Sequence, residues 1–289
     1  MKIVIFGGTG WLGQNLISNL YDRGIDCNDI IVISSIKKKI KFKNYNLVTL
    51  NLSEFLSLEK LWCDEYYDFA FLSKYSLSKI SNNQFIDMTN LLINASTNFI
   101  NKNYIQKALL ASSGAVYSNK SELEPYGLQK LNQEKQFKRS CLSNDTSFHI
   151  ARIFSLLAPY IDVDANYALS NFIKFGIKKE TIKINSNKQV IRSYLAPETL
   201  FTYFIRNNKT LIYDAWNLNL DIYELASLIS KIFDVALDIP NNYHISKYKD
   251  IYTSKNDIFQ KVNLVEFKKE IIENIIDISI AKEFKISKF

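Results

Sequence analysis

Three side chains in the middle of the sequence have the types and spacing needed to move a proton. Ser113 ends the apolar run Leu109–Ser113, and Tyr126 and Lys130 follow it four residues apart. On a helix this spacing places the tyrosine and the lysine on one face. A neighbouring ammonium stabilises a phenolate, so the pKa of the tyrosine falls from about 10 toward neutrality. The phenol could then exchange a proton with a substrate hydroxyl or carbonyl, while the serine hydroxyl holds the same oxygen.

A Tyr-x-x-x-Lys spacing is a weak signal by itself, because the chain contains 17 tyrosines and 36 lysine and arginine residues. The alternative is a surface tyrosine stacked on the aliphatic stem of a lysine. Two neighbouring features favour the catalytic interpretation: the Ser112-Ser113 pair just before, and a glycine-rich segment further upstream. We therefore interpret Ser113, Tyr126 and Lys130 as catalytic residues.

The glycine-rich segment has the features of a dinucleotide-binding turn. Four of the 8 glycines in the chain lie in it: Gly7, Gly8, Gly10 and Gly13. They separate the apolar run Ile3–Phe6, typical of a buried strand, from a stretch with apolar residues at helical spacing that begins at Leu12. Glycines at such a turn let the backbone approach a pyrophosphate, whose charge the helix N-terminus favours. The pattern is a G-x-x-G-x-x-G variant of the dinucleotide fingerprint and lacks the Gly-Lys-Ser/Thr ending of an NTP-binding loop.

Alternating strands and helices must position these residues. We expect strands at 2–6, 30–34, 46–50, 69–73, 108–112 and 147–154, and helices at 12–22 and 90–99. This alternation predicts an α/β fold of Rossmann type, with a doubly wound parallel sheet and right-handed crossovers. We assign residues 1–158 to this dinucleotide-binding domain and residues 159–289 to a smaller C-terminal α/β part that mainly binds substrate. There we expect helices at 168–177, 223–233 and 265–276, and a strand at 211–217 that could return to the first domain.

Composition argues against several classes of protein. No stretch approaches the roughly 20 apolar residues of a membrane span, and the N-terminal residues lack the pattern of a signal peptide. Three widely spaced cysteines, Cys27, Cys63 and Cys141, suggest reduced thiols and have no metal-ligand spacing. The net charge of +7 is spread along the chain, which favours a solvated basic surface over a nucleic-acid footprint. We therefore expect a cytoplasmic protein with no metal, no membrane insertion and no nucleic-acid partner.

Taken together, these segments resemble the extended short-chain dehydrogenase/reductase family, which comprises NAD(P)-dependent epimerases, dehydratases and reductases of nucleotide sugars. Gly7, Gly10 and Gly13 match its cofactor glycines, and the three interpreted catalytic residues match its triad. Residues 151–159 are similar to its R-x-x-N-x-x-G-P stretch, and residues 189–195 to its R-D/S-Y/F-x-Y segment. The resemblance spans nearly the whole chain.

The resemblance implies roles for further residues. Arg192 would clamp the diphosphate of a nucleotide sugar, for which a bidentate guanidinium is well suited, and Asn171 and Ser155 would also contact the substrate. It leaves a homodimer open, because family members often pair through two helices of the first domain. The fingerprint and the resemblance together imply these cofactor contacts: Gly7, Gly10, Trp11, Leu12, Gly13, Ser34, Ser35, Lys37, Asn51, Leu52, Ser73 and Lys130.

Several residues depart from the family pattern. Ser155 replaces an asparagine, Asn51 stands where an aspartate is common, and Ser73 and Lys74 replace two alanines beside the cofactor. The segment between the catalytic serine and tyrosine is also short for the family. Because that segment usually shapes the rim of the active site, the sequence does not identify the sugar.

The residues after Ser113 narrow the reaction. The resemblance implies Asp-Glu there in 4,6-dehydratases and a cysteine in enzymes that epimerise the third and fifth carbons. This chain has Gly114 and Ala115 instead, which disfavours both reactions. Hydride transfer at one carbon remains, either as net reduction of a 4-keto sugar or as 4-epimerisation.

The segment after the second expected strand favours NADP. NAD-preferring proteins place an acid there for the ribose 2′-hydroxyl, whereas residues 32–39 contain no acid and several cations. Ser34, Ser35 and Lys37 could accept a 2′-phosphate. The leading hypothesis is therefore an NADPH-dependent reductase of a nucleotide-diphosphate 4-keto-6-deoxysugar in surface polysaccharide synthesis. The alternatives are a nucleotide-sugar 4-epimerase with tightly bound NAD and a catalytically inactive NADP(H)-binding regulator.

Overall fold

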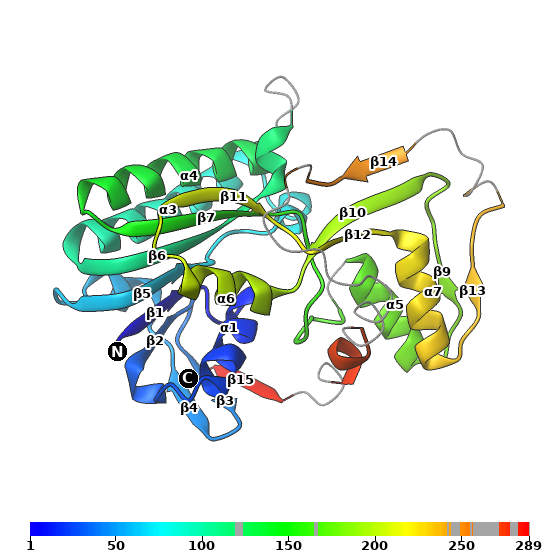
Figure 1. The fold of residues 1–289 in the computed structure, drawn as a ribbon, viewed down its shortest axis with the longest axis horizontal. Coiled ribbons are helices and arrows are strands. Elements are labelled where there is room, and N and C mark those ends of the chain that lie inside the picture. The colour runs from blue at the N-terminus through cyan, green and yellow to red at the C-terminus, as the bar shows by residue number, and fades with distance from the viewer. Residues whose placement is uncertain are drawn as a thin grey trace. The chain divides into compact units, whose positions relative to one another are not determined.

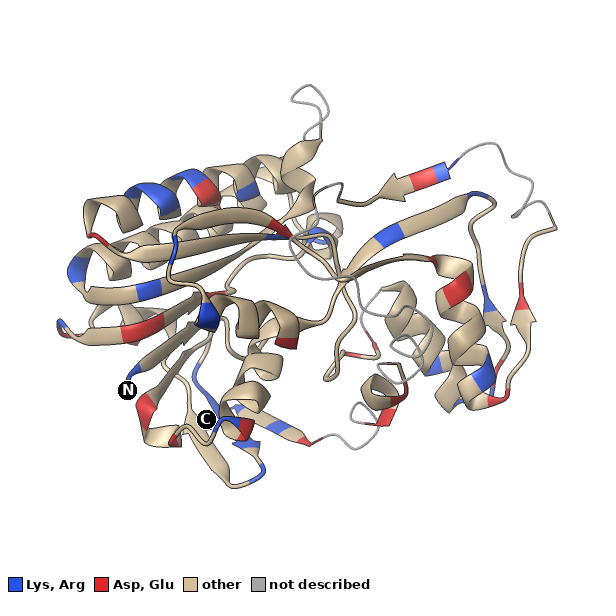
Figure 2. Cartoon of the chain, viewed as in Figure 1, with Lys and Arg blue, Asp and Glu red and all other residues tan. Residues whose placement is uncertain are grey.

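The computed structural model of the protein describes residues 1–118, 124–164, 167–241, 243, 249–254, 256, 272–277 and 283–288. The chain forms two compact units, each described below by itself. The first contains Met1–Arg152, Leu200–Tyr213 and Glu283–Phe289, and the second contains Ile153–Thr199 and Asp214–Lys282. None of the helices in these described ranges is both long and apolar enough to cross a membrane. Lys and Arg residues are distributed over both units (Figure 2).

The first unit is built on a six-stranded sheet with the order β11-β7-β6-β5-β1-β2 (Figure 1). The pairs β1–β2, β1–β5 and β5–β6 are parallel. This is the Rossmann-type α/β fold that the sequence predicts. The strands are β1 (Ile3–Phe6), β2 (Ile30–Ile33), β5 (Trp62–Asp68), β6 (Tyr104–Ser113), β7 (Ser147–Ile153) and β11 (Leu211–Ala215).

Helices cover both faces of this sheet, as adjacent tyrosines of β5 show. Tyr66 donates a hydrogen bond to Ser96 of α3 on one face, and Tyr67 packs its ring against Phe201 and Phe204 of α6 on the other. Because side chains alternate along a strand, both faces of β5 are buried. The longer helices of this unit are α1 (Trp11–Asp22), α3 (Asn82–Lys102), α4 (Pro125–Ser143) and α6 (Pro197–Arg206), and the short ones are α2 (Leu52–Leu56), η1 (Cys27–Asp29), η2 (Lys74–Ser78) and η3 (Gly114–Tyr117).

The strand expected at 46–50 does not extend the parallel sheet. Residues Tyr45–Val48 form β4 of a separate antiparallel sheet with the order β15-β3-β4, where β3 is Lys38–Phe42 and β15 is Phe284–Lys288. Leu50 makes one isolated parallel bridge, to Ile33 of β2. Strand β3 was not predicted because its lysines make the segment polar, although the intervening Ile40 and Phe42 are buried.

One face of this small sheet is apolar and the other is basic. Phe42 stacks on Phe284 with ring centroids 4.2 Å apart. On the opposite side of the ribbon, Lys41 lies directly across from Lys285, and both side chains are exposed. Contacts on the apolar face therefore hold together two strands whose outer lysines repel one another.

The strand expected at 69–73 is also wrong, because the strand at this place is Trp62–Asp68. The acidic residues of this segment give it a polar pattern, so it was not predicted as a strand. They are buried with partners, however: Glu65 accepts a hydrogen bond from Tyr67, and Asp68 accepts one from Ser96. A polar segment can thus form a central strand when its polar groups are satisfied inside the protein.

The second unit contains a mixed sheet and two packed helices. The sheet order is β12-β10-β14, with β8 also pairing with β10. Helices α5 and α7 approach so closely that a Cβ on Gly176 would lie 2.2 Å from the ring of Phe233. Residues 272–277 are helical, whereas the rest of the helix expected at 265–276 lies outside the described residues. The elements are β8 (Ser155–Leu156), α5 (Ala168–Ile177), β9 (Ile182–Lys183), β10 (Gln189–Leu195), β12 (Leu218–Asp221), α7 (Ile222–Phe233), β13 (Leu237–Asp238) and β14 (Lys249–Tyr252).

A buried histidine in the first unit makes its stability depend on pH. His149 of β7 is fully buried, with Nδ1 lying 3.2 Å from the Tyr213 hydroxyl and its ring packed edge-on to Phe204. Burial, and then the nearby Lys107 charge, lower the pKa of His149 to about 4. The unfolded chain therefore binds a proton below about pH 6.5 that the folded chain does not accept.

We expect the free energy of unfolding to fall by about 1 to 2 kcal/mol more between pH 7 and pH 5 in the wild type than in His149→Phe. The phenylalanine keeps the aromatic packing but cannot bind a proton. Denaturant unfolding of both proteins at the two pH values measures this difference. Equal pH dependence in the two proteins would show that His149 does not control it.

Candidate active site

Three glycines of the first turn differ in what surrounds them. Gly7 has a φ of +88°, and a Cβ there would lie 2.8 Å from the Ala70 amide nitrogen. A Cβ on Gly13 would lie 2.5 Å from the Cα of Gly8. Gly10 is exposed, and the nearest atom to a Cβ there would be the Gly7 carbonyl oxygen at 3.3 Å. Gly7 and Gly13 thus permit close packing within the protein, whereas Gly10 leaves its outer side open to a ligand.

The turn leads into the N-terminus of α1, which suits an anion. Gly10 is the N-cap residue and makes no side-chain capping bond, and the first turn of α1 carries no acidic side chain. The partial positive charge at this end is therefore not offset locally. Leu12 is buried beneath the turn, and Trp11 is half-buried. The turn fits the pyrophosphate of a dinucleotide.

The structure brings Tyr126 and Lys130 together around one aromatic ring. Helix α4 begins at Pro125, so Tyr126 lies in its first turn and Lys130 one turn later. The Tyr126 ring lies edge-on to Phe71 with centroids 5.7 Å apart, and Lys130 Nζ lies 3.8 Å from the centroid of the same ring. Ser113 ends β6, and its Oγ accepts a hydrogen bond from the Ala115 amide at 3.2 Å.

The ammonium of Lys130 is almost completely buried. Its side chain is 5% exposed, and Nζ donates to the Ala111 carbonyl oxygen at 2.9 Å and to Gln133 Oε1 at 3.0 Å. Burial lowers the pKa of Lys130, while the carboxylates of Asp68 and Glu134 raise it. The site therefore holds a charge whose protonation depends on its neighbours.

The buried carboxylate of Glu134 fixes α4 to the end of β6. Glu134 Oε1 accepts a hydrogen bond from Ser112 Oγ at 2.6 Å, and Arg152 binds the same carboxylate through Nε at 2.9 Å and Nη2 at 2.8 Å. Arg152 Nη1 also donates to the Tyr117 hydroxyl at 2.8 Å. The hydrogen bonds to Glu134 are the largest cause that raises the pKa of Arg152. Ser112 and Glu134 thus hold the strand end that carries Ser113.

The supporting residues Glu134, Asp68 and Phe71 were not predicted from the sequence. Glu134 lies four residues after Lys130, so helical periodicity could have placed it on the same face. Asp68 and Phe71 had no such signal, because the strand that ends at Asp68 was expected at 69–73. Ser73 was predicted beside the cofactor, but the backbone that contacts Gly7 belongs to Phe69 and Ala70. Ser73 Oγ lies 3.2 Å from Ser76 Oγ at the start of η2.

The residues expected to receive a 2′-phosphate have partners within the protein. Ser34 is buried, with Oγ 2.7 Å from Thr49 Oγ1, and Lys37 Nζ lies 2.7 Å from Glu54 Oε1. Ser35 is exposed. A 2′-phosphate would have to compete with Glu54 for the lysine.

The two residues expected near the adenine lie at the start of α2. Asn51 is the N-cap residue of this helix, and its Oδ1 accepts hydrogen bonds from the Glu54 amide at 2.9 Å and from Ser53 Oγ at 2.7 Å. Leu52 is the first residue of α2 and is half-buried. The side-chain oxygen of Asn51 thus caps a helix.

The expected substrate residues belong to the second unit. Ser155 lies in β8 opposite Tyr194, and Asn171 is half-buried on α5. Arg192 of β10 forms a two-point contact with Asp250, through Nη1 to Oδ1 at 3.1 Å and Nη2 to Oδ2 at 2.8 Å. The guanidinium is thus presented in the geometry that also binds paired phosphate oxygens.

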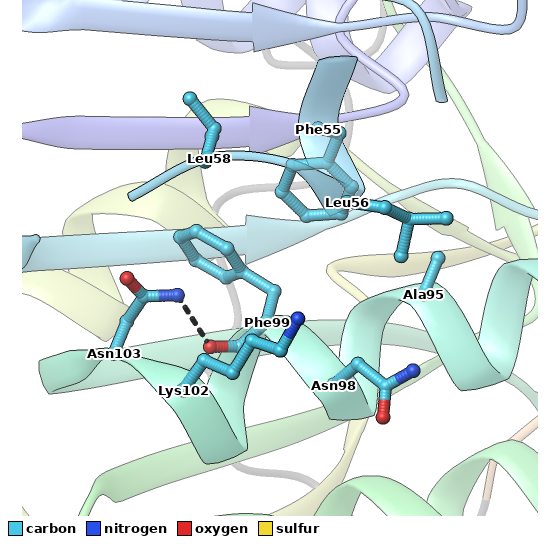
Figure 3. A pocket seen from close by; sticks show the side chains of 8 residues that line it. All are labelled: Phe55, Leu56, Leu58, Ala95, Asn98, Phe99, Lys102 and Asn103. Atoms are coloured by element: carbon cyan, nitrogen blue, oxygen red, sulfur yellow. Dashed lines mark hydrogen bonds between the residues drawn. The ribbon is translucent and has the colours of Figure 1, made fainter. Parts of the chain in front are cut away.

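Two other features of the described residues do not suggest catalysis. The described residues contain no group of three or more His, Cys, Asp and Glu side chains that could hold a metal ion. A small pocket between α2 and α3 is lined by both apolar and polar side chains, and Asn103 Nδ2 donates there to the Phe99 carbonyl oxygen at 2.7 Å (Figure 3). The pocket shares no residue with the site around Tyr126. Its lining consists of Phe55, Leu56, Leu58, Ala95, Asn98, Phe99, Lys102 and Asn103.

The fold of the first unit and its glycine turn define a Rossmann-type α/β protein that is suited to bind a dinucleotide. The chain matches the NAD dependent epimerase/dehydratase family over residues 3–204 and belongs to that family. This match confirms the family resemblance that the sequence indicates.

Curated relatives are distant in sequence. UDP-glucuronic acid decarboxylase 5 of Arabidopsis thaliana is 24% identical over 223 residues, which cover 67% of this chain and 62% of that protein. UDP-glucuronic acid decarboxylase 3 of the same plant is 23% identical over 272 residues, covering 83% and 76%. The chain therefore spans less than two thirds of the length of the first of these relatives.

Solved structures share the fold over nearly the whole chain. The UDP-glucose 4-epimerase of Thermotoga maritima superposes with a TM-score of 0.68 at 15% identity, covering 98% of this chain and 99% of that one. The UDP-glucuronic acid 4-epimerase of Bacillus cereus gives 0.67 at 17% identity, covering 96% and 99%. At these identities the likeness concerns the fold.

The glycine geometry separates a binding defect from a folding defect. We expect Gly10→Ala to keep the wild-type Tm within a few degrees but to weaken dinucleotide binding by about tenfold or more, since the added methyl points to the open side of the turn. Gly13→Ala should instead destabilise the protein by roughly 1 to 3 kcal/mol, because its Cβ meets backbone. Thermal unfolding and calorimetric titration with NAD measure both effects. Equal losses of Tm in the two variants would contradict these roles.

Proposed function

We propose that the protein is a nucleotide-sugar 4-epimerase that retains NAD through the catalytic cycle in the cytoplasm. The observation that carries the proposal is the pairing of Tyr126 and Lys130 around Phe71, in the same unit as the glycine turn. A phenol beside an ammonium is suited to exchange a proton with a sugar hydroxyl, and the turn is suited to hold a dinucleotide.

The chain's own groups would perform the proton transfers. NAD, when bound, supplies hydride acceptance from C4 and hydride return to either face of that carbon. Tyr126 as phenolate takes the proton of the C4 hydroxyl, and the Ser113 hydroxyl donates a hydrogen bond to the same oxygen. When the hydride returns, Tyr126 gives the proton back, so that no atom or electron is gained or lost overall. Lys130 stabilises the phenolate between these steps.

The residues after Ser113 support a reaction without elimination. Gly114 and Ala115 begin η3 and offer no side-chain acid or base at this place. Loss of water from the neighbouring carbons needs such a group in addition to the tyrosine. The site is thus equipped for proton and hydride transfer at a single carbon.

The contacts of Lys37 support NAD over the NADP that its sequence context favours. Because Lys37 is paired with Glu54 and the Ser34 hydroxyl with Thr49, a 2′-phosphate finds neither group available without rearrangement. NAD suits an epimerase, which recycles its cofactor. The NADPH-dependent 4-ketoreductase is the second candidate, favoured by the absence of an acid at residues 32–39.

The proposed substrate is a UDP-sugar. Both named groups of similar proteins, the plant decarboxylases and the bacterial epimerases, act on UDP-sugars by name. Arg192 is the proposed contact for the diphosphate, with Ser155 and Asn171 as further substrate contacts. The Arg192 side chain is 25% exposed, and its planar guanidinium can bind two oxygens at once.

Loss of the phenol should abolish turnover. We expect the purified protein to contain NAD and to interconvert a UDP-sugar and its C4 epimer without added cofactor. Tyr126→Phe should retain NAD but lose about 10²- to 10⁴-fold in kcat, as expected for loss of a general acid–base group. Tyr104→Phe, at an exposed tyrosine, is the matched control and should keep full activity.

Other results would select the other functions. Oxidation of added NADPH that requires a 4-keto sugar nucleotide would identify the reductase. Dinucleotide binding without turnover of any UDP-, dTDP-, GDP- or CDP-linked sugar would identify a regulator. Unchanged turnover in Tyr126→Phe would remove this tyrosine from the mechanism.

The Arg192–Asp250 contact predicts opposite effects of two substitutions on UDP binding. Arg192→Ala should weaken binding about tenfold or more, because a charged hydrogen bond contributes roughly 1.5 to 3 kcal/mol. Asp250→Asn should strengthen binding severalfold, because it removes the carboxylate that competes for the guanidinium. Calorimetric titration with UDP measures both, and Asp238→Asn at an exposed acid of the same unit is the control. Weaker binding in Asp250→Asn would mean that Asp250 orients Arg192 for the ligand.

A further inference from the structure

A second buried acid near Lys130 has no role in the reaction described so far. Asp68 is the last residue of β5 and is 1% exposed. It lies between Phe6 of β1 and Leu110 of β6 in the register of the central strands. A carboxylate in the middle of a buried sheet costs several kcal/mol unless charge or hydrogen bonds compensate it. The contacts of Asp68 therefore indicate what the carboxylate does.

A directed chain of hydrogen bonds ends on Asp68. Tyr66 OH donates to Ser96 Oγ at 2.9 Å, and Ser96 Oγ donates to Asp68 Oδ2 at 2.6 Å. With Ser96 accepting from the tyrosine, its own proton points to the carboxylate. An acceptor at the end of such a chain is best satisfied when it is ionised.

The counter-charge for Asp68 comes from Lys130 of α4, whose Nζ donates to the carbonyl oxygen of Ala111, the residue after the Leu110 that pairs with Asp68. Burial raises the pKa of Asp68, while the hydrogen bond from Ser96 and the charge of Lys130 lower it. The Gln133 side chain, which accepts from Lys130 Nζ, also lowers the pKa of Asp68. Each of the two buried charges thus depends on the other.

Other titratable groups around this pair are neutral or already paired. Burial raises the pKa of the Cys141 thiol, and burial together with the Asp68 charge raises the pKa of Tyr66, so both stay protonated at neutral pH. Burial raises the pKa of Cys63 to about 12. Glu134, the other acid that acts on Lys130, is bound at two points by Arg152. Among the described residues, Asp68 is therefore the acid left to balance Lys130.

We infer that Asp68 is a positioning residue, whose buried carboxylate keeps Lys130 protonated beside Phe71 so that the ammonium stabilises the Tyr126 phenolate. The inference deepens the proposed function, on which it rests for its kinetic consequence. It assigns no contact between Asp68 and substrate or cofactor. Ser96 donates a hydrogen bond to one oxygen of the carboxylate, and Gln133 accepts one from the ammonium.

The test is a titration of Tyr126 itself. The phenolate absorbance of each protein is measured against pH, and the curve of the same protein carrying Tyr126→Phe is subtracted to remove the other tyrosines. In Asp68→Asn the titration midpoint of Tyr126 should rise by about one pH unit or more, because Lys130 loses its counter-charge and deprotonates more readily. If Lys130 were unaffected, removing the negative charge of Asp68 would lower the titration midpoint of Tyr126, because a nearby negative charge disfavours a phenolate. A raised midpoint therefore indicates that Lys130 has lost its proton. The limb of the pH profile of kcat/KM that depends on the phenolate should move to higher pH by the same amount.

Two further variants separate charge from folding. Cys141→Ala loosens the same core without changing a charge and should leave the midpoint in place. Ser96→Ala keeps the carboxylate but removes its hydrogen bond, so the midpoint should rise by a smaller amount than in Asp68→Asn. If Asp68→Asn does not fold, Ser96→Ala decides alone.

An unchanged or lowered midpoint in folded Asp68→Asn, or in Ser96→Ala where Asp68→Asn does not fold, would overturn the inference and leave Asp68 as a structural acid. Because the titration needs no sugar, its outcome is independent of the proposed reaction. A raised midpoint in a protein that turns over no sugar nucleotide would sustain the inference and reject the epimerase.

Discussion

A lysine ammonium held almost entirely out of water is the interaction on which the candidate site depends. Removing such a charge from water costs several kcal/mol, so the surrounding protein must supply donors, acceptors and opposite charge. The Ala111 carbonyl, Gln133, the face of Phe71 and the carboxylate of Asp68 do so from separate elements. Helix α4 is therefore fixed against the ends of β5 and β6, which in turn places Tyr126.

The short segment that follows β5 joins the glycine turn to α4, the helix that carries Tyr126 and Lys130. Its first residue after the strand, Phe69, and the next, Ala70, lie against Gly7, where a side chain would not fit. Phe71 then lies between Tyr126 and Lys130. A shift of this segment by one residue would thus disturb the proposed dinucleotide site and the proposed proton-transfer pair together.

The sequence predicts well those features that depend on local pattern. The apolar run Ile3–Phe6, the glycine turn and the helical spacing of 168–177 each correspond to an element of the structure. Patterns failed where polar residues are satisfied by distant partners. The acidic residues of β5 and the lysines of β3 gave both segments a polar pattern, so these strands were not predicted at their places. Lys37 favoured a phosphate site until its contact with Glu54, 17 residues further along, was known. The role inferred for Asp68 likewise depends on Ser96 and Lys130, which are remote from it in sequence.

The small sheet formed by β15, β3 and β4 carries a built-in sensitivity to ionic strength. Lys41 and Lys285 lie directly opposite each other on its outer face, while Phe42 and Phe284 stack on the inner one. Dissolved ions screen the repulsion between exposed lysines but leave the aromatic contact nearly unchanged, because the screening length falls from about 30 Å at 0.01 M to about 8 Å at physiological salt. Attachment of β15 to the first unit should therefore tighten as salt is added, which is opposite to the behaviour of a strand held by ion pairs.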